Sequence, residues 1–185
     1  MSDELLPKTK RTNFFFLTFG IILLSVPIYF RIREFGKLYV SPDREAMKQT
    51  EVITYDPYII EIERIGLKIE VVESGIVDGV WEVSDKAANH LDISADPGGG
   101  GNILLYAHNR DNLFGPIKFL KRDDLIKIID GSGNVHKYRV ESAFETDPSD
   151  VKIASNTESE VLTIYTCSGL FDRKRFVIRA VPESM

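Results

Sequence analysis

The side chain best suited to covalent chemistry is Cys167, the only cysteine among the 185 residues. It follows the apolar run 163–166, so we expect it where a strand ends and a loop begins, rigid on one side and accessible on the other. The thiolate is the attacking species, and a free cysteine has a pKa of about 8.5. A nucleophilic Cys167 therefore needs a cation or a proton acceptor nearby. Taken alone, a single cysteine is more often a buried structural residue.

His108 is the first candidate partner. It ends the run 102–107, again where a predicted strand meets a loop. As a general acid or base it could protonate a leaving amine and later deprotonate an incoming one. The other two histidines are weaker candidates, because His90 sits in a loop-like stretch and His136 comes just after a predicted turn.

Arg175 is the second candidate partner, and it opens the apolar run 175–181. A hairpin joining this run to 161–166 would bring the guanidinium near Cys167. There it could stabilise an oxyanion or hold the substrate backbone. Arg179 lies an even number of residues away and shares the same strand face, so alternation alone does not exclude it.

Composition excludes some other functions. The formal net charge of -5 and the pI of about 5.3 argue against nucleic-acid binding, which normally needs a basic patch. The glycine run 97–101 lacks the Lys-Ser/Thr that follows in a phosphate-binding loop, so it predicts a tight turn. Asp123, Asp124 and Asp130 do not have the spacing of an EF-hand loop. No metal and no cofactor is therefore predicted.

Three segments carry these residues in a recognisable order. Residues 163–167 read TIYTC, residues 97–108 read PGGGGNILLYAH, and residues 175–178 read RFVI. They resemble the TLxTC, PGxxGNxxxxGH and R-hydrophobic-V-V motifs of the sortase family. Ile164 stands in place of leucine and Ala107 in place of the frequent glycine. The similarity extends over about residues 59–181.

The resemblance implies a fold and a reaction. The expected fold is all-β, a closed eight-stranded sortase-type barrel with short helices, and the expected activity is cysteine transpeptidation on an LPxTG-like sorting signal. Cys167 would be the nucleophile and His108 the general acid and base. Arg175 would stabilise the oxyanion or hold the substrate, and Thr166 would help at the oxyanion or substrate-binding position. The amine acceptor would be a peptidoglycan precursor or a pilin lysine.

The hydrophobic pattern is consistent with that fold. Short β-rich runs separated by turn signals, with little helix, indicate a closed barrel or a sandwich. A hairpin turn is predicted at 131–134 and one short helix at 114–120, with Pro116 in its first turn. The predicted strands are 59–63, 68–72, 102–107, 125–129, 136–140, 161–166 and 175–181, with a further short one around 81–83.

The N-terminal region predicts a membrane anchor. Residues 14–30 carry no charge and reach the lower end of the length of a spanning helix, about 17–25 residues. A cleaved signal peptide is the alternative, but the run is longer than a usual h-region and no A-x-A-like site follows it. The expected organisation is a tail over 1–13, the anchor, a linker over 31–50 and a catalytic domain over 51–185.

The orientation of this anchor is less strongly specified. Three basic residues precede the run and three follow it closely, so the positive-inside rule gives no preference. A short tail and a long following domain are compatible with a cytoplasmic N-terminus. We therefore expect a single-pass protein of the cell membrane with its catalytic domain outside the cytoplasm.

Two other functions are compatible with the same residues. One is an anchored cysteine protease that hydrolyses its own thioester, and product analysis with and without an added amine distinguishes it from a transpeptidase. The other is a catalytically silent barrel that binds a partner; an activated Cys167 should alkylate faster than an ordinary thiol near neutral pH. An L,D-transpeptidase is disfavoured because an SHGC-type segment is absent.

Overall fold

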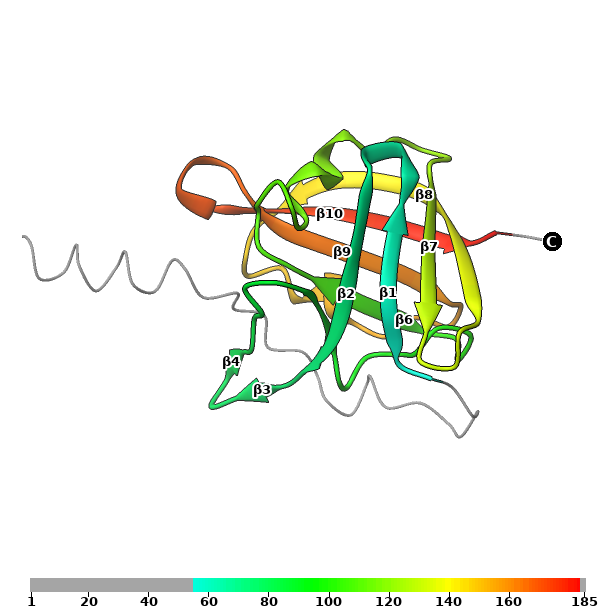
Figure 1. Cartoon of the computed structure of the whole chain (residues 1–185). Coiled ribbons are helices and arrows are strands. Elements are labelled where there is room, and N and C mark those ends of the chain that lie inside the picture. Colours follow the sequence, from blue (N-terminus) through cyan, green and yellow to red (C-terminus); the bar gives the residue numbers. More distant parts are fainter. Residues whose placement is uncertain (1–54, 184–185) are drawn as a thin grey trace, which may run out of the picture. The chain divides into compact units, whose positions relative to one another are not determined.

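The computed structural model describes residues 55–183, which fold into short strands joined by turns and brief 3-10 helices (Figure 1). The strands are β1 (Pro57–Ile62), β2 (Leu67–Ser74), β3 (Ile76–Val77), β4 (Val80–Trp81), β5 (Ala88–Leu91), β6 (Asn102–Tyr106), β7 (Leu125–Asp130), β8 (Val135–Thr146), β9 (Val161–Ser168) and β10 (Lys174–Pro182). The 3-10 helices are η1 (Glu63–Ile65), η2 (Gly115–Phe119), η3 (Val151–Ala154) and η4 (Leu170–Asp172).

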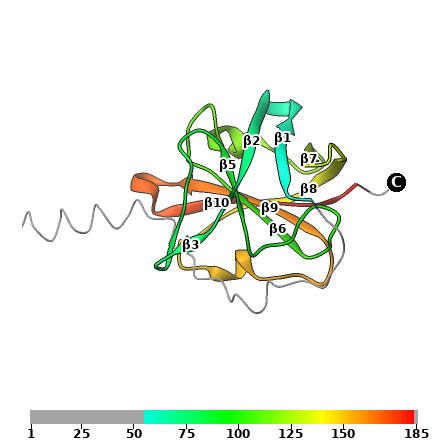
Figure 2. The same ribbon diagram turned by 60° about the horizontal axis from the view of Figure 1, so that its bottom comes forward.

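Eight of these strands close into a barrel. Their order around it is β1-β2-β5-β6-β9-β10-β8-β7, and β7 pairs with β1 to complete the ring. Most neighbours are antiparallel, but β2 pairs with β5 and β6 pairs with β9 in parallel. Closure leaves no unpaired sheet edge, and β3 and β4 form a separate two-stranded hairpin beside the barrel (Figures 1 and 2).

Apolar side chains from alternate strand positions fill the barrel interior. Alternate residues of every strand point to one face, and here those residues are isoleucine, leucine, valine and alanine with little or no exposure. Tyr138 also lies inside, and its hydroxyl donates to Glu160 Oε1 at 2.7 Å. The helix η2 contributes Ile117 to the same cluster. The interior is therefore a packed core and not a channel.

A second apolar cluster covers the outer face of β6, β9 and β10. Tyr106 and Tyr165 stack there with ring centroids 5.7 Å apart, and Trp81 from β4 packs edge-on against Tyr106 at 4.9 Å. Ile153 from η3 joins this cluster, and Cys167 packs at its margin. The β3–β4 hairpin and η3 therefore shield one side of the strand that carries the cysteine.

The seven longer predicted strands are all present, as β1, β2, β6, β7, β8, β9 and β10. The turn predicted at 131–134 joins β7 to β8 as a hairpin. The helix predicted at 114–120 is the shorter 3-10 turn η2, with proline at its start. The predicted fold class, an all-β closed barrel of eight strands, is confirmed.

The eighth strand differs from the prediction. The segment predicted around 81–83 is the short β4, which pairs with β3 outside the barrel. The eighth barrel strand is β5, which includes His90, so the assignment of this histidine to a loop was wrong. β5 could not be recognised from an alternating pattern, because it is buried on both faces. It also contains Asn89, a polar residue whose side chain makes buried hydrogen bonds.

The membrane prediction concerns other residues. Within the described range 55–183, no helix has the length and apolar character needed to cross a bilayer. The predicted anchor at 14–30 lies outside the described residues.

Candidate active site

Cys167 and Arg175 form a cross-strand pair. The hairpin of β9 and β10 aligns Lys174 with Ser168, Arg175 with Cys167 and Phe176 with Thr166. Directly opposed residues of an antiparallel pair point to the same face, with Cβ atoms about 4.5–5.5 Å apart. The predicted hairpin therefore exists and brings the guanidinium-bearing residue next to the cysteine.

His108 approaches Cys167 from the other side of β9. The parallel register of β6 and β9 aligns Tyr106 with Tyr165, and Ala107 N then donates to Tyr165 O at 3.4 Å. Continuing this register by two positions places His108 level with Cys167. Cys167 on β9 and Arg175 on β10 are thus cross-strand neighbours, and His108 lies in the segment that follows β6, on the other side of β9.

Thr166 fastens the two strands at this point. Its side chain is buried and its Oγ1 donates to Ala107 O at 2.7 Å, directly before His108. In this arrangement the hydroxyl serves the backbone that carries the histidine.

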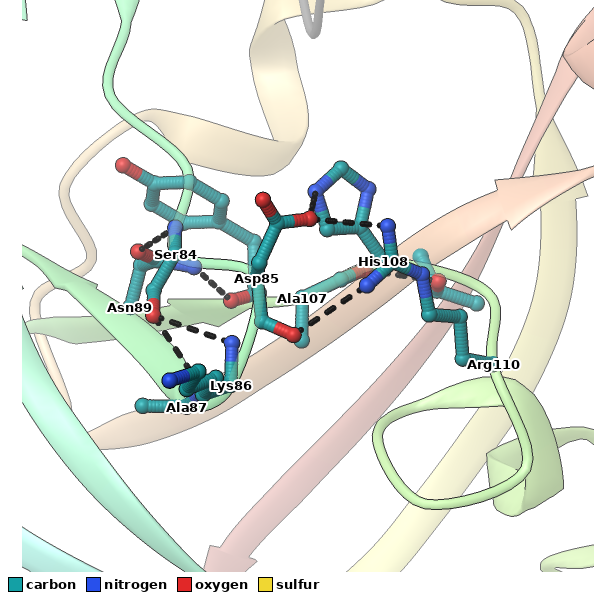
Figure 3. Close-up of polar contacts among 10 residues, drawn as sticks. Ser84, Asp85, Lys86, Ala87, Asn89, Ala107, His108 and Arg110 are labelled. Atoms are coloured by element: carbon teal, nitrogen blue, oxygen red, sulfur yellow. Dashed lines mark hydrogen bonds and ion pairs between the residues drawn. The ribbon is translucent and has the colours of Figure 1, made fainter.

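The imidazole of His108 faces an acidic residue that the sequence analysis did not identify. Its Nε2 lies 3.7 Å from Asp85 Oδ1, and the His108 side chain is about one-third exposed. Figure 3 shows the Asp85 carboxylate between His108 and Arg110. Arg110 Nη2 donates to the same Oδ1 at 2.8 Å. Neither Asp85 nor Arg110 belongs to a motif, so sequence alone offered no signal for them.

The thiol of Cys167 is partly buried against the outer apolar cluster. Burial raises the pKa of Cys167 because the thiolate loses hydration, the nearby Arg175 guanidinium lowers it, and the Asp172 carboxylate raises it. The net direction is upward, which favours the neutral thiol over the thiolate in this environment.

Arg175 is almost fully buried, at 2% exposure. Its Nη1 donates to the carbonyl of Asp172, in the β9–β10 turn, at 2.9 Å and to that of Lys174, the first residue of β10, at 3.0 Å. The guanidinium is thus held at the base of this turn. A substrate carbonyl reaching Nη1 would replace one of these two acceptors.

Unpaired polar atoms gather around the cysteine. Among residues 55–183, the buried side-chain nitrogen and oxygen atoms without a hydrogen-bond partner are Tyr165 OH, Ser168 Oγ and Arg175 Nε. The first two flank Cys167 on β9 and the third lies opposite it. Such atoms are rare in folded proteins, and their concentration at one place is typical of a functional site.

The other two histidines lie elsewhere. His90 is buried, with Nδ1 2.6 Å from Glu73 Oε1 and Nε2 3.0 Å from Ala95 O, so it is a structural residue of β5. His136 lies on β8 with Nε2 2.9 Å from Asp130 Oδ2, next to the β7–β8 turn. An open pocket beside His136 is lined by the start of β8 and the end of β10, away from Arg175.

Residues 55–183 contain no group of three or more His, Cys, Asp or Glu side chains arranged to hold a metal ion.

Comparison with known proteins gives a consistent result. Residues 60–183 match the family model described as Sortase domain. Among solved structures, a sortase D5 transpeptidase from Clostridium perfringens is 25% identical with a TM-score of 0.61, over 76% of this chain and 84% of that one. Sortase A from Listeria monocytogenes is 23% identical with a TM-score of 0.59, over 70% and 88%. A search of curated proteins found no match.

A group B Streptococcus pilus island 1 sortase C2 shares the fold at 19% identity, with a TM-score of 0.59 over 80% of this chain and 87% of that one. The family model covers well over half of the sequence and includes all three residues of the Cys167 site. Sortases are cysteine transpeptidases, and the sequence motifs, the closed barrel and the family match agree. The chain belongs to the sortase family.

Proposed function

We propose that this protein is a membrane-anchored sortase that cleaves an LPxTG-like sorting signal and transfers the cleaved protein to an amine. Cys167 is the nucleophile, His108 the general acid and base, and Arg175 the residue that stabilises the oxyanion or holds the substrate backbone. The observation that carries this proposal is the cross-strand pairing of Cys167 with Arg175 on β9 and β10, with His108 in the segment just after β6, the other neighbour of β9.

In the first half of the reaction, the thiolate of Cys167 attacks the threonine carbonyl carbon of the sorting signal. A carbon–sulfur bond forms and the carbonyl oxygen becomes an oxyanion beside the Arg175 guanidinium. The oxyanion collapses, the Thr–Gly amide bond breaks, and His108 donates a proton to the leaving amine. The product is a thioester with Cys167.

In the second half, an amine attacks the thioester carbonyl and His108 accepts a proton from it. The carbon–sulfur bond then breaks, the new amide is released and the thiolate is regenerated. Because burial raises the pKa of the resting thiol, Cys167 must first lose its proton. The neutral His108 imidazole accepts this proton and later donates it to the leaving amine, while the Arg175 guanidinium stabilises the thiolate.

The substrate and location are parts of the same proposal. The acceptor amine belongs to a peptidoglycan precursor or to a pilin lysine. We propose that residues 14–30 anchor the protein in the cell membrane with the catalytic domain outside the cytoplasm. Membrane fractionation tests this, because deletion of residues 1–31 should move the protein from the membrane to the soluble fraction. Accessibility of the domain to external protease tests the orientation.

The activity is tested with a library of fluorogenic LPxTG-like peptides and amine acceptors of two kinds, oligoglycine and a lysine side chain. Intact mass spectrometry should show an acyl adduct on the wild-type chain and none on Cys167→Ala. Cleavage that is equally fast without an amine, with a free acid as product, would identify a protease instead. If no peptide yields an adduct and Cys167→Ala behaves like the wild type, the proposal is wrong.

A further inference from the structure

We propose that Asp85 is a positioning residue for His108, acting together with Arg110. This inference rests on the proposed role of His108 in the sortase reaction. Its basis is the network drawn in Figure 3, in which a short loop before β5 presents a carboxylate to the imidazole. The network links two segments that are far apart in sequence.

The loop carrying Asp85 is tightly built. Ser84 Oγ accepts from the backbone N–H groups of Lys86 and Ala87, both at 3.2 Å, which closes the turn on either side of Asp85. Ser84 N donates to Asn89 Oδ1 at 2.8 Å. Asp85 is therefore fixed in place even though its side chain is 72% exposed.

Asn89 connects this loop to the strand that leads to His108. It is fully buried, and its Nδ2 donates to Tyr106 O at 3.0 Å, two residues before the histidine. Its Oδ1 also accepts from Ser74 Oγ at 3.0 Å. A single buried amide thus sets the distance between the Asp85 loop and the end of β6.

Arg110 holds Asp85 from the histidine's own loop. Its Nη2 donates to Asp85 Oδ1 at 2.8 Å and its Nη1 to Asp85 O at 3.2 Å. The Arg110 backbone is fixed in turn, since its carbonyl accepts from Leu113 N and Gly115 N, both at 3.0 Å. A Cβ at Gly115 would lie 2.7 Å from that carbonyl oxygen, so glycine is required for this close turn.

One carboxylate oxygen of Asp85 lies close to both the Arg110 guanidinium and the His108 imidazole. Oδ1 lies 2.8 Å from Arg110 Nη2 and 3.7 Å from His108 Nε2. Attraction to Asp85 directs Nε2 of the imidazole toward the loop and leaves Nδ1 as the nitrogen free for the reaction.

Solvent limits the size of this effect. Exposed ion pairs contribute little, and the expected change in an equilibrium is no more than about fivefold. We therefore expect Asp85→Ala to lower kcat by about two- to fivefold and to leave KM unchanged. Asp85→Glu should retain most of the rate, because a longer side chain still reaches Nε2.

Three further variants separate positioning from loop stability. Asp85→Asn keeps an acceptor for Arg110 but loses the charge, so it should behave like Asp85→Ala. Arg110→Ala releases the loop but leaves the carboxylate available to His108, so it should lose less activity. Asp111→Asn is the matched control, because it removes an exposed carboxylate from the same loop as Arg110 and should match the wild type.

The experiment uses the full-length chain in detergent micelles with 13C-labelled histidine. Its first readout is kcat and KM for transpeptidation, and its second is the NMR order parameter of the His108 ring, assigned by comparison with His108→Ala. Thermal unfolding confirms that each variant is folded. We expect Asp85→Ala to lower both kcat and the ring order parameter, and Asp111→Asn to lower neither.

Two negative results have different meanings. If the wild type is active and Asp85→Ala has the same kcat and the same ring order, Asp85 does not position His108. If the wild type has no transpeptidase activity, the proposed function fails instead. The ring order parameter then decides the positioning claim by itself, since it needs no substrate.

Discussion

Arg175 lies directly opposite Cys167 across the β9–β10 ladder, and its guanidinium donates to the carbonyls of Asp172, in the turn between these strands, and Lys174, at the start of β10. The strand register therefore positions Arg175, and the hydrogen bonds to nearby backbone carbonyls orient its guanidinium. Its Nε has no hydrogen-bond partner despite being buried. A buried donor of this kind is costly unless it serves an acceptor during function.

Replacing Arg175 tests its proposed role. Arg175→Ala should reduce kcat by about 100- to 1,000-fold, the usual effect of removing one oxyanion donor. Arg175→Lys keeps the charge but loses the planar fork, and it should be only partly active. Arg179→Ala is the matched control, because Arg179 pairs with Thr163 further along the same strands. Equal losses in Arg175→Ala and Arg179→Ala would contradict a role for Arg175 in the reaction.

The raised pKa of Cys167 predicts the pH dependence of its alkylation. Since only the thiolate reacts, iodoacetamide should modify the folded protein slowly at pH 7 and progressively faster as the pH rises. Asp172→Asn removes a charge that raises this pKa, so it should accelerate alkylation at a fixed pH. Asn also tolerates the left-handed conformation of Asp172, with φ of 57°. An alkylation rate that does not depend on pH between 7 and 10 would refute this prediction.

The Thr166 hydroxyl should support both activity and stability. Thr166→Val leaves Ala107 O without its partner and should cost about 1–3 kcal/mol of unfolding free energy. Because this bond holds the segment bearing His108, kcat should fall by about tenfold or more. Thr163→Val is the control: it breaks a similar buried bond, to Asn102 Oδ1, at the other end of the paired strands. Its stability cost should be comparable and its kcat nearly unchanged.

The buried pair of His90 and Glu73 predicts a pH-dependent stability. Burial lowers the pKa of His90, but the hydrogen bond and charge of Glu73, with help from Ala95 O, raise it above the ordinary 6.5. For a raised folded-state pKa, the stabilisation is complete below about pH 6.5 and is lost as the pH rises through the folded value. Urea unfolding should show stability falling over that range.

Matched variants test the origin of this pH dependence. Glu73→Gln should remove most of it, because the charged partner of His90 is gone. Glu70→Gln changes an exposed glutamate of the same strand and should retain the wild-type profile. If the two variants show identical profiles, the pair does not control the pH dependence.

The longer strands were predictable because their apolar residues alternate and turn residues bound them. In β7, for example, Ile126 and Ile128 point inward while Lys127 points outward. β5 has no such pattern, since all four of its residues are buried. Asn89 on this strand is satisfied by partners on β2, β6 and a loop, and those contacts exist only after folding.

The site was predictable to a similar extent. Cys167, His108 and Arg175 stand at strand ends within recognisable motifs, and the register places them on neighbouring strands. Asp85 could not be predicted because it is an exposed loop residue with no motif, and only the folded loop brings it to His108. The orientation of the Arg175 guanidinium could not be predicted from sequence either, because its hydrogen-bond acceptors are backbone carbonyls.

The parallel pairing of β6 and β9 has a consequence for folding. Two antiparallel neighbours can pair starting from the hairpin that joins them. Ala107 and Thr166, which are hydrogen-bonded to each other, are instead separated by 59 positions in the sequence. Contacts with such large sequence separation form slowly, because the entropy cost of closing a long loop comes before the contacts can stabilise the chain. The cysteine and the histidine are therefore brought together only once β9 has inserted between β6 and β10. We expect the proposed reaction at the Cys167 thiol to require the completed barrel.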